Sequence, residues 1–449
     1  MDPQRQTGAQ TLRRLRLSRG WSWSDLADKL RFLAQTLRIT RIAAIQTSSI
    51  RRTIARWESG VAVPDEQYRL LLGHAYARTP MGAVALGPGS DFGELLDALA
   101  QLGVPDEQLT DLAGTVSAAI TSAGMNLLAF VNGPLRVDLA TALTRPETAD
   151  LELVAGLEAA SDTVDAQIGA VPFARLHLAQ AVIVDACRYL LQTGQPATIQ
   201  AKLRIVAARA YALAARLAFE THDDATALAL YDEAVKAAGE KAPSRRALIR
   251  TSQTMVAFYA TGDIKRARSI ADAAVQDARR GESVLMRARA HALQAEMAAR
   301  SAQHRHAQVA LHLAWHDLDA DTTDDPMNGA FSQGRLRGFE GICGIFLGHA
   351  ETAERQLTAS VQTLTGSRHT VQRAIVLTDR ALARLHTSDA GAPEVAVEQL
   401  HECVDLTATT RGRVPGQRLR QARLELRPWR GEPFVADLDD HIHTALIGI

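Results

Sequence analysis

The run Thr47-Ser48-Ser49-Ile50-Arg51-Arg52-Thr53-Ile54-Ala55-Arg56-Trp57-Glu58-Ser59-Gly60 decides how the first part of this chain folds. Its apolar residues Ile50, Ile54 and Trp57 recur at spacings of four and three, which places them on one helical face. The hydroxyl residues at its start can cap a helix, and Gly60 is the residue type that ends helices in a left-handed conformation. The run therefore predicts a short amphipathic helix that ends at Gly60.

The other faces of this helix carry arginine and hydroxyl side chains, namely Ser49, Arg51, Arg52, Thr53 and Arg56. Arginine bonds guanine through two hydrogen bonds, and Ser or Thr can bond base edges or phosphates in a major groove. The alternative is a basic helix face that only contacts solvent. The neighbouring sequence favours the interpretation that the helix binds DNA.

Two helices precede this run and one follows it. The segment 12–17 predicts a first helix, and 20–30 predicts a turn, a cap and a second helix. Pro64 and two acidic residues open a further helix through Leu72, as helix starts prefer. This order resembles the lambda-repressor-like, or XRE-type, helix-turn-helix of bacterial transcription regulators. The segment 54–60 is similar to the recognition-helix signature of that family.

The resemblance implies a set of roles for individual residues. It implies a buried ion pair between Arg16 and Glu58. It also implies DNA contacts from the start of the second helix and from the recognition helix: Trp23, Ser24, Arg51, Arg52, Thr53 and Arg56. The chain departs from the family at 31–46, where the family has a turn of three or four residues. This insertion is amphipathic, so either the second helix is longer or an extra helix lies before the recognition helix.

Length and charge divide the chain into functional parts. A chain of 449 residues is longer than a single hydrophobic core usually organises, so we expect two or three domains. Residues 1–60 hold twelve Lys and Arg against four Asp and Glu, whereas the remainder holds 38 against 46. A basic domain on an acidic body is typical of a nucleic-acid-binding protein whose other domain has a separate task. The predicted parts are a DNA-binding domain (1–78), a linker (79–90), a helical middle or dimerisation region (91–204) and a repeat domain (205–449).

Several classes of protein are disfavoured by what the sequence contains. Three widely spaced cysteines form neither a metal motif nor a disulfide framework, which favours a reducing cytoplasm and, with DNA binding, association with the nucleoid. The uncharged run 112–135 is long enough to span a bilayer but too polar, so we expect no membrane span. His312 and His316 have a spacing that could bind a metal, but no third ligand follows. We expect no metal, no cofactor and no enzymatic activity.

The rest of the chain predicts helices only, so the expected fold class is all-α. In the middle region the helices are expected at 91–102, 106–122, 136–144, 149–168, 173–193 and 197–221. The second half repeats a small residue and a second small residue seven positions later, with the first at Ala227, Ala267, Ala307, Ala353 and Ala396. Small residues two turns apart allow helices to pack closely, and these units resemble tetratricopeptide repeats stacked as an α-solenoid.

Such a solenoid has a concave face that can bind extended ligands. Repeat positions place Arg209, Arg289 and Arg335 at equivalent sites on the first helices. Arg216 lies two turns after Arg209, and Phe219 and Tyr259 occupy another such row. If they face inward, the groove suits a carboxylate or an acidic peptide. The alternative is that these arginines are solvated.

Together, the head and the repeats resemble actinobacterial regulators with an XRE-type head and a sensing body. The sequence therefore predicts a homodimeric, sequence-specific regulator of a double-stranded DNA operator, whose repeats bind a peptide, a small molecule or a protein. The alternative is a tetratricopeptide-like interaction scaffold with weak or accessory DNA binding.

Overall fold

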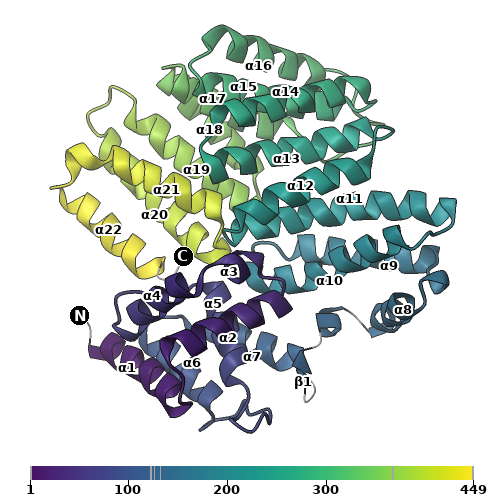
Figure 1. The fold of residues 1–449 in the computed structure, drawn as a ribbon. Helices are drawn as coiled ribbons and strands as arrows, with labels where there is room; N and C mark the ends of the chain where they lie inside the picture. Colours follow the sequence, from purple (N-terminus) through teal and green to yellow (C-terminus); the bar gives the residue numbers. More distant parts are fainter. Residues whose placement is uncertain (1–2, 122–123, 126, 132, 367–368, 447–449) are drawn as a thin grey trace.

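The computed structural model describes residues 3–121, 124–125, 127–131, 133–366 and 369–446. Within these ranges the chain is all-α, as predicted, apart from one antiparallel pair between β1 (Ile120–Thr121) and β2 (Gly124–Met125). Figure 1 shows a head of helices near the N-terminus and a curved stack of helix pairs that ends beside that head. No helix of the described ranges is long and apolar enough to cross a membrane.

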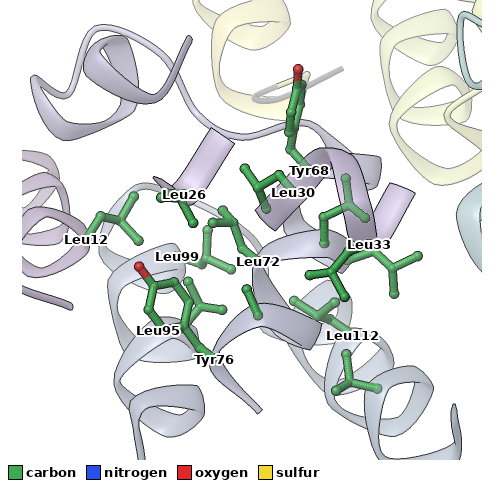
Figure 2. Close-up of a cluster of buried hydrophobic side chains, with 14 of the residues drawn as sticks. Leu12, Leu26, Leu30, Leu33, Tyr68, Leu72, Tyr76, Leu95, Leu99 and Leu112 are labelled. Carbon is green, nitrogen blue, oxygen red and sulfur yellow. The ribbon is translucent and has the colours of Figure 1, made fainter. Parts of the chain in front are cut away.

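The head is built from the first helices of the chain: α1 (Pro3–Ser18), α2 (Trp23–Thr36), α3 (Thr40–Ala44), α4 (Thr47–Glu58), α5 (Glu66–Tyr76), α6 (Asp91–Gln101) and α7 (Asp106–Ala119). Their apolar faces form one core. Figure 2 shows Leu12 of α1, Leu30 of α2, Leu72 of α5, Leu99 of α6 and Leu112 of α7 within this cluster. The head thus contains more helices than the predicted DNA-binding segment.

Residues 79–90, the predicted linker between two domains, lie between helices that share one hydrophobic core. Helix α6 packs against α1, and α7 packs against α5, so both belong to the head rather than to a separate middle region. The segment between α5 and α6 is tied by a bridge between Arg78 and Val84 and by backbone hydrogen bonds from Thr79 to Ala83 and from Ala85 to Ala77. It connects helices of one core and does not separate two cores.

The insertion at 31–46 contains both a longer second helix and an extra helix. Helix α2 continues to Thr36, a turn follows in which Arg38 has a φ of 58°, and α3 begins at Thr40. Leu37, Ile39 and Ile42 are buried in the head core, which explains why the insertion is amphipathic. Helix α3 also packs against α12 of the repeats, so the insertion connects the head to the body.

The middle region follows the predicted helices closely. It comprises η1 (Leu127–Phe130), α8 (Gly133–Thr144), η2 (Pro146–Thr148), α9 (Leu151–Ala166), α10 (Phe173–Gln192) and α11 (Ala197–Glu220). The pair of β1 and β2 and the short helix η1 interrupt 112–135, so its described residues form no single long helix. Helices α9, α10 and α11 pack together and share a core with the first repeats.

The second half is a stack of helix pairs, formed by α11 with α12 (Asp224–Ala238), α13 (Pro243–Thr261) with α14 (Ile264–Arg280), α15 (Val284–Arg300) with α16 (His304–Leu318), α17 (Gln333–Phe346) with α18 (Ala350–Thr363) and α19 (Thr370–Leu385) with α20 (Ala392–Thr410). All five repeat landmarks lie on the second helix of a pair and are at most 1% exposed. The second small residue of each unit is fully buried as well. The predicted period therefore marks the helix pairs of a solenoid.

Helices α21 (Arg413–Glu425) and α22 (Pro433–Ala445), joined by η4 (Arg427–Trp429), follow the last pair. Figure 1 shows them in yellow beside α20. Helix α21 packs against α19, α22 packs against α20, and Val414 at the start of α21 contacts the core of the first repeats. The C-terminal helices thus connect the last repeat with the first.

Candidate nucleic-acid interface

Helix α4 is held in the head by its apolar face. Ile50, Ile54 and Trp57 are 0%, 1% and 3% exposed, which confirms the predicted buried face. Trp57 makes an edge-to-face contact with Tyr68 of α5, with 4.9 Å between ring centroids. Gly60 has a φ of 71° and lies directly after the helix, as expected for a residue that ends it. The burial of one face leaves the opposite face of α4 at the surface.

The start of α4 differs from the prediction that its hydroxyl residues cap the helix. The N-cap residue is Gln46, and no side chain caps the helix there. The Thr47 hydroxyl instead donates to Asp28 Oδ1 of α2 at 2.7 Å and accepts a hydrogen bond from Arg31 Nη1 at 3.1 Å. The capping prediction was wrong because Thr47 bonds across to the neighbouring helix rather than to its own backbone.

A buried polar cluster fixes the end of α4 against α1 and α2. Arg16 donates from Nε to Glu58 Oε1 at 2.6 Å and from Nη2 to Oε2 at 2.8 Å, and the two side chains are 7% and 5% exposed. The pair implied by the family resemblance is therefore present. The Trp23 indole N–H also donates to Glu58 Oε2, at 2.9 Å. One carboxylate thus ties α4 to both α1 and α2.

The outer face of α4 carries three exposed arginines, Arg51, Arg52 and Arg56. Within the described part of the chain, none of the three forms an ion pair with a carboxylate. Ser49 and Thr53 are half-buried between them, and the Thr53 hydroxyl donates to the Ser49 carbonyl at 3.2 Å. Arg52 Nε donates to the Ser48 carbonyl at 3.5 Å, but the three guanidinium groups have no carboxylate partner. Free guanidinium donors of this kind can bond phosphates and base edges.

The start of α2 offers backbone donors beside this face. Ser22 caps α2 and forms a reciprocal capping box with Asp25, so Trp23 and Ser24 are the first residues of the helix. A helix N-terminus favours an anion such as a phosphate. The Trp23 side chain is 41% exposed, but its N–H is engaged by Glu58. The Trp23 indole N–H is therefore used within the protein, where it links α2 to α4.

The predicted ligand groove of the repeats contains part of the chain itself. Helix α21 lies against the first helices of the pairs, where Arg418 donates from Nε to the Tyr259 hydroxyl of α13 at 2.6 Å. The Arg418 guanidinium also pairs with Asp379 of α19 and lies 3.5 Å from Glu296 of α15. Because α13, α15 and α19 are separated along the chain, this one arginine bridges three repeats across the concave face.

Arg413 makes a second such contact at the first repeat. Its backbone N–H donates to Glu220 Oε2 at 2.7 Å, and its guanidinium donates to the Phe219 carbonyl at 2.9 Å and pairs with Asp224. The guanidinium carbon lies 4.3 Å from the Phe219 ring centroid. The concave face near Phe219 and Tyr259 is therefore acidic and filled by arginines of α21. The prediction of an open cationic groove with these aromatic side chains available to a ligand was wrong, because α21 covers them.

The four predicted arginines divide into two groups. Arg209 is half-exposed and pairs with Glu158 and Asp162 of α9, away from the groove. Arg289 and Arg335 both donate to the Ala330 carbonyl, each at 3.1 Å.

Burial, together with the positive charges of Arg335 and Arg216, lowers the pKa of Arg289 to about 10. Arg216, Arg289 and Arg335 therefore do come together as a cationic row, whereas Arg209 does not.

The sequence contained no signal for these long-range contacts. Arg413 and Glu220 lie 193 positions apart, and a single sequence does not show which arginine meets which carboxylate. His312 and His316 are exposed on α16, and the described ranges contain no group of three potential metal ligands. No family model matches the chain, and no curated protein matches it.

Proposed function

We propose that this protein is a sequence-specific regulator that binds double-stranded DNA through α4. The observation that carries the proposal is the exposed face of Arg51, Arg52 and Arg56, opposite a fully buried apolar face. Guanidinium groups without carboxylate partners are available for bidentate bonds to guanine or for phosphates. The Arg16–Glu58–Trp23 cluster supports the proposal because it holds the basic face at a fixed angle to α2.

The proposal includes a homodimer that binds an operator with two half-sites about one DNA turn apart. In this arrangement the repeats carry the contacts between two copies and respond to a peptide, a small molecule or a protein. Arg216, Arg289 and Arg335 remain candidates for ligand contacts, since Arg413 and Arg418 of α21 contact Phe219 and Tyr259. A ligand that binds one arrangement of the two heads more tightly than another changes DNA affinity by that difference.

The proposal is tested by selecting genomic DNA fragments on the purified full-length protein at physiological salt. A regulator enriches a defined, near-palindromic motif, and its affinity for that motif falls steeply as salt increases. Arg51→Ala or Arg52→Ala is expected to weaken binding to the motif by about 1–3 kcal/mol and to relax preference at one base position. Arg209→Ala is the matched control, because Arg209 lies in the repeats and pairs with carboxylates there.

Equal affinity for the selected motif and for scrambled DNA would reject sequence-specific recognition. Diffuse retention of DNA together with stable capture of a defined partner protein would favour the alternative function, an interaction scaffold. The covered concave face argues against that alternative, because a scaffold of this kind presents an open groove to its partner.

A further inference from the structure

A cavity lies where the head, α10 and the end of α20 meet. Its walls include Glu66 and Arg69 of α5, Thr115 of α7, Arg175 of α10 and Arg411, the C-cap residue of α20. Counted with the solvent at its mouth, the empty volume is about 330 Å³. The enclosed space that the centre of a water-sized molecule can reach is only about 30 Å³, so a ligand here must be small. The cavity is distinct from the concave face of the repeats and from the α4 surface.

Arg69 is the most unusual side chain in this cavity. It is 5% exposed, and its Nη1 atom has no hydrogen-bond partner among the described residues. Burial lowers the pKa of Arg69 to about 10, with Glu66 acting in the opposite direction. A buried guanidinium nitrogen without a hydrogen-bond partner costs free energy, and the described protein contacts do not satisfy it.

Two further buried polar atoms face the same space without a partner. Thr115 is 3% exposed, and its hydroxyl bonds neither the backbone nor a side chain within the described ranges. Gln108 Oε1, one helical turn from Asp111, is likewise buried and unpaired. The cavity therefore holds unused donors on Arg69 and Thr115 and an unused acceptor on Gln108.

The charges around the cavity leave a positive excess. Arg69, Arg175 and Arg411 face only two carboxylates, Glu66 and Asp111. Arg175 Nη1 lies 3.0 Å from Asp111, and Arg411 lies 3.7 Å from Glu66, so each carboxylate already has one cation beside it. Glu66 also accepts the Ala174 backbone N–H at 2.7 Å. Arg69 is the third arginine of the cavity, and neither of these carboxylates is left to pair with it alone.

We propose that this cavity binds a small oxyanion that also carries a hydroxyl group, such as inorganic phosphate or a 2-hydroxy acid. One anionic oxygen accepts from Arg69 and Thr115, and the hydroxyl donates to Gln108. A single negative charge neutralises the positive excess, and the bound ion satisfies the three buried atoms together. Because α5, α7, α10 and the α20–α21 turn all contribute, the ligand bridges the head and both ends of the body. The site does not depend on the proposed DNA binding.

The test is calorimetric titration of the full-length protein with sodium phosphate and, separately, sodium L-lactate, at an ionic strength held constant with sodium chloride. We expect saturable binding at one site per chain for at least one of the two, and the arm that saturates identifies the class of anion. Sodium acetate, which has the charge of lactate but no hydroxyl, is expected to bind more weakly. Absence of saturable binding in both arms would overturn the proposal.

Two substitutions locate the site. Arg69→Met is expected to weaken binding by about tenfold or more, because it removes a charge-assisted hydrogen bond. Thr115→Val, which preserves shape, is expected to weaken it to a smaller extent and covers the case in which the first variant does not fold. Arg209→Met, an exposed paired arginine, is the control and retains wild-type affinity. Unchanged affinity in both cavity variants would mean an adventitious ion only.

Thermal unfolding in the absence of the anion shows whether Arg69 is retained to bind a ligand or to stabilise the fold. If Arg69 is retained for a ligand, Arg69→Met leaves the unfolding temperature of the anion-free protein unchanged or higher, since burying Met avoids the cost of an unpaired charge. Anions then stabilise the wild type but not the variant. A marked loss of stability in the anion-free variant would show that Arg69 serves the fold through Glu66 and would overturn the proposal.

Discussion

Glu58 shows how much of the head depends on a single carboxylate. It accepts two hydrogen bonds from Arg16 and one from Trp23 while being 5% exposed. Glu58→Ala leaves the Arg16 guanidinium buried with no counter-ion, a change that costs about 3–5 kcal/mol for buried pairs. We expect a loss of this size in the free energy of unfolding of the head, measured by urea denaturation.

The control for this prediction is Arg14→Ala, which removes an ion pair of similar length at the surface. Arg14 and Glu94 are 3.0 Å apart, with side chains 65% and 41% exposed. Exposed pairs of this kind contribute about 0–1 kcal/mol. Similar losses in the two variants would contradict the assignment of Glu58 as the link between α1, α2 and α4.

His74 makes the stability of the head depend on pH. It is 4% exposed on α5, and neither ring nitrogen has a hydrogen-bond partner in the described ranges. Burial, assisted by the charge of Arg78, lowers the pKa of His74 to about 4, against about 6.5 in an unfolded chain. Between these values the unfolded state binds more protons, so the free energy of unfolding falls as the pH decreases from about 6.5 through about 4.

The corresponding variant is His74→Leu, which removes the titrating group without adding a polar atom. We expect the pH-dependent loss to shrink by about 3 kcal/mol over this window, as measured by urea denaturation at a series of pH values. His312→Leu, on the exposed face of α16, is the matched control. If the free energy of unfolding of the His74 variant still falls with decreasing pH as in the wild type, other buried groups cause the pH dependence.

At the scale of single elements, α17 and α18 approach each other through glycine. A Cβ on Gly341 would lie 2.4 Å from Leu357 Cγ and 3.1 Å from the Ala353 carbonyl oxygen. A Cβ on Gly334 or Gly338 would likewise come within 3.1 Å of α18. These three glycines therefore allow α17 to pack closely against α18. Gly348, by contrast, lies after α17 with a φ of 78° and serves the turn.

We therefore expect Gly341→Ala to destabilise the protein by about 1–3 kcal/mol through overpacking, although Ala is the better helix former. Gly114→Ala in α7 is the matched control, because no atom lies within 4 Å of the added methyl group. That variant should gain up to about 1 kcal/mol from helix propensity. Thermal unfolding of both variants tests the pair, and stabilisation by Gly341→Ala would show that the two helices can separate without cost.

At the scale of the whole molecule, α21 joins repeats that are distant in sequence. Arg418→Met leaves Asp379 and Glu296 without a shared cation, and both are buried. We expect a loss of about 3–5 kcal/mol and faster amide hydrogen exchange in α21 and α13. Arg423→Met, on the same helix but in a half-exposed pair with Asp439, should leave exchange in α13 unchanged. Equal exchange in the two variants would mean that Arg418 does not hold the solenoid closed.

Much of this architecture was determined by the sequence itself. The period of small residues marked each helix pair, because two helices can approach closely only where their side chains are small. The apolar spacing of Ile50, Ile54 and Trp57 predicted the buried face of α4, since helical periodicity depends on local order alone. By exclusion, the same spacing indicated which arginines would lie at the surface.

Only the tertiary structure decided what fills the concave face of the repeats and which buried guanidinium nitrogen, Nη1 of Arg69, lacks a hydrogen-bond partner. The sequence predicted a cationic, open groove, yet Arg413 and Arg418 of α21 lie there on carboxylates from α12, α15 and α19. In the sequence Arg69 lies beside an apolar run, and nothing there predicts a role for it. Its cavity forms only where α5, α7, α10 and α20 meet. The physical reason is common to both cases. Ion pairs and cavities depend on distances between groups far apart in the chain, and local pattern carries no information about those distances.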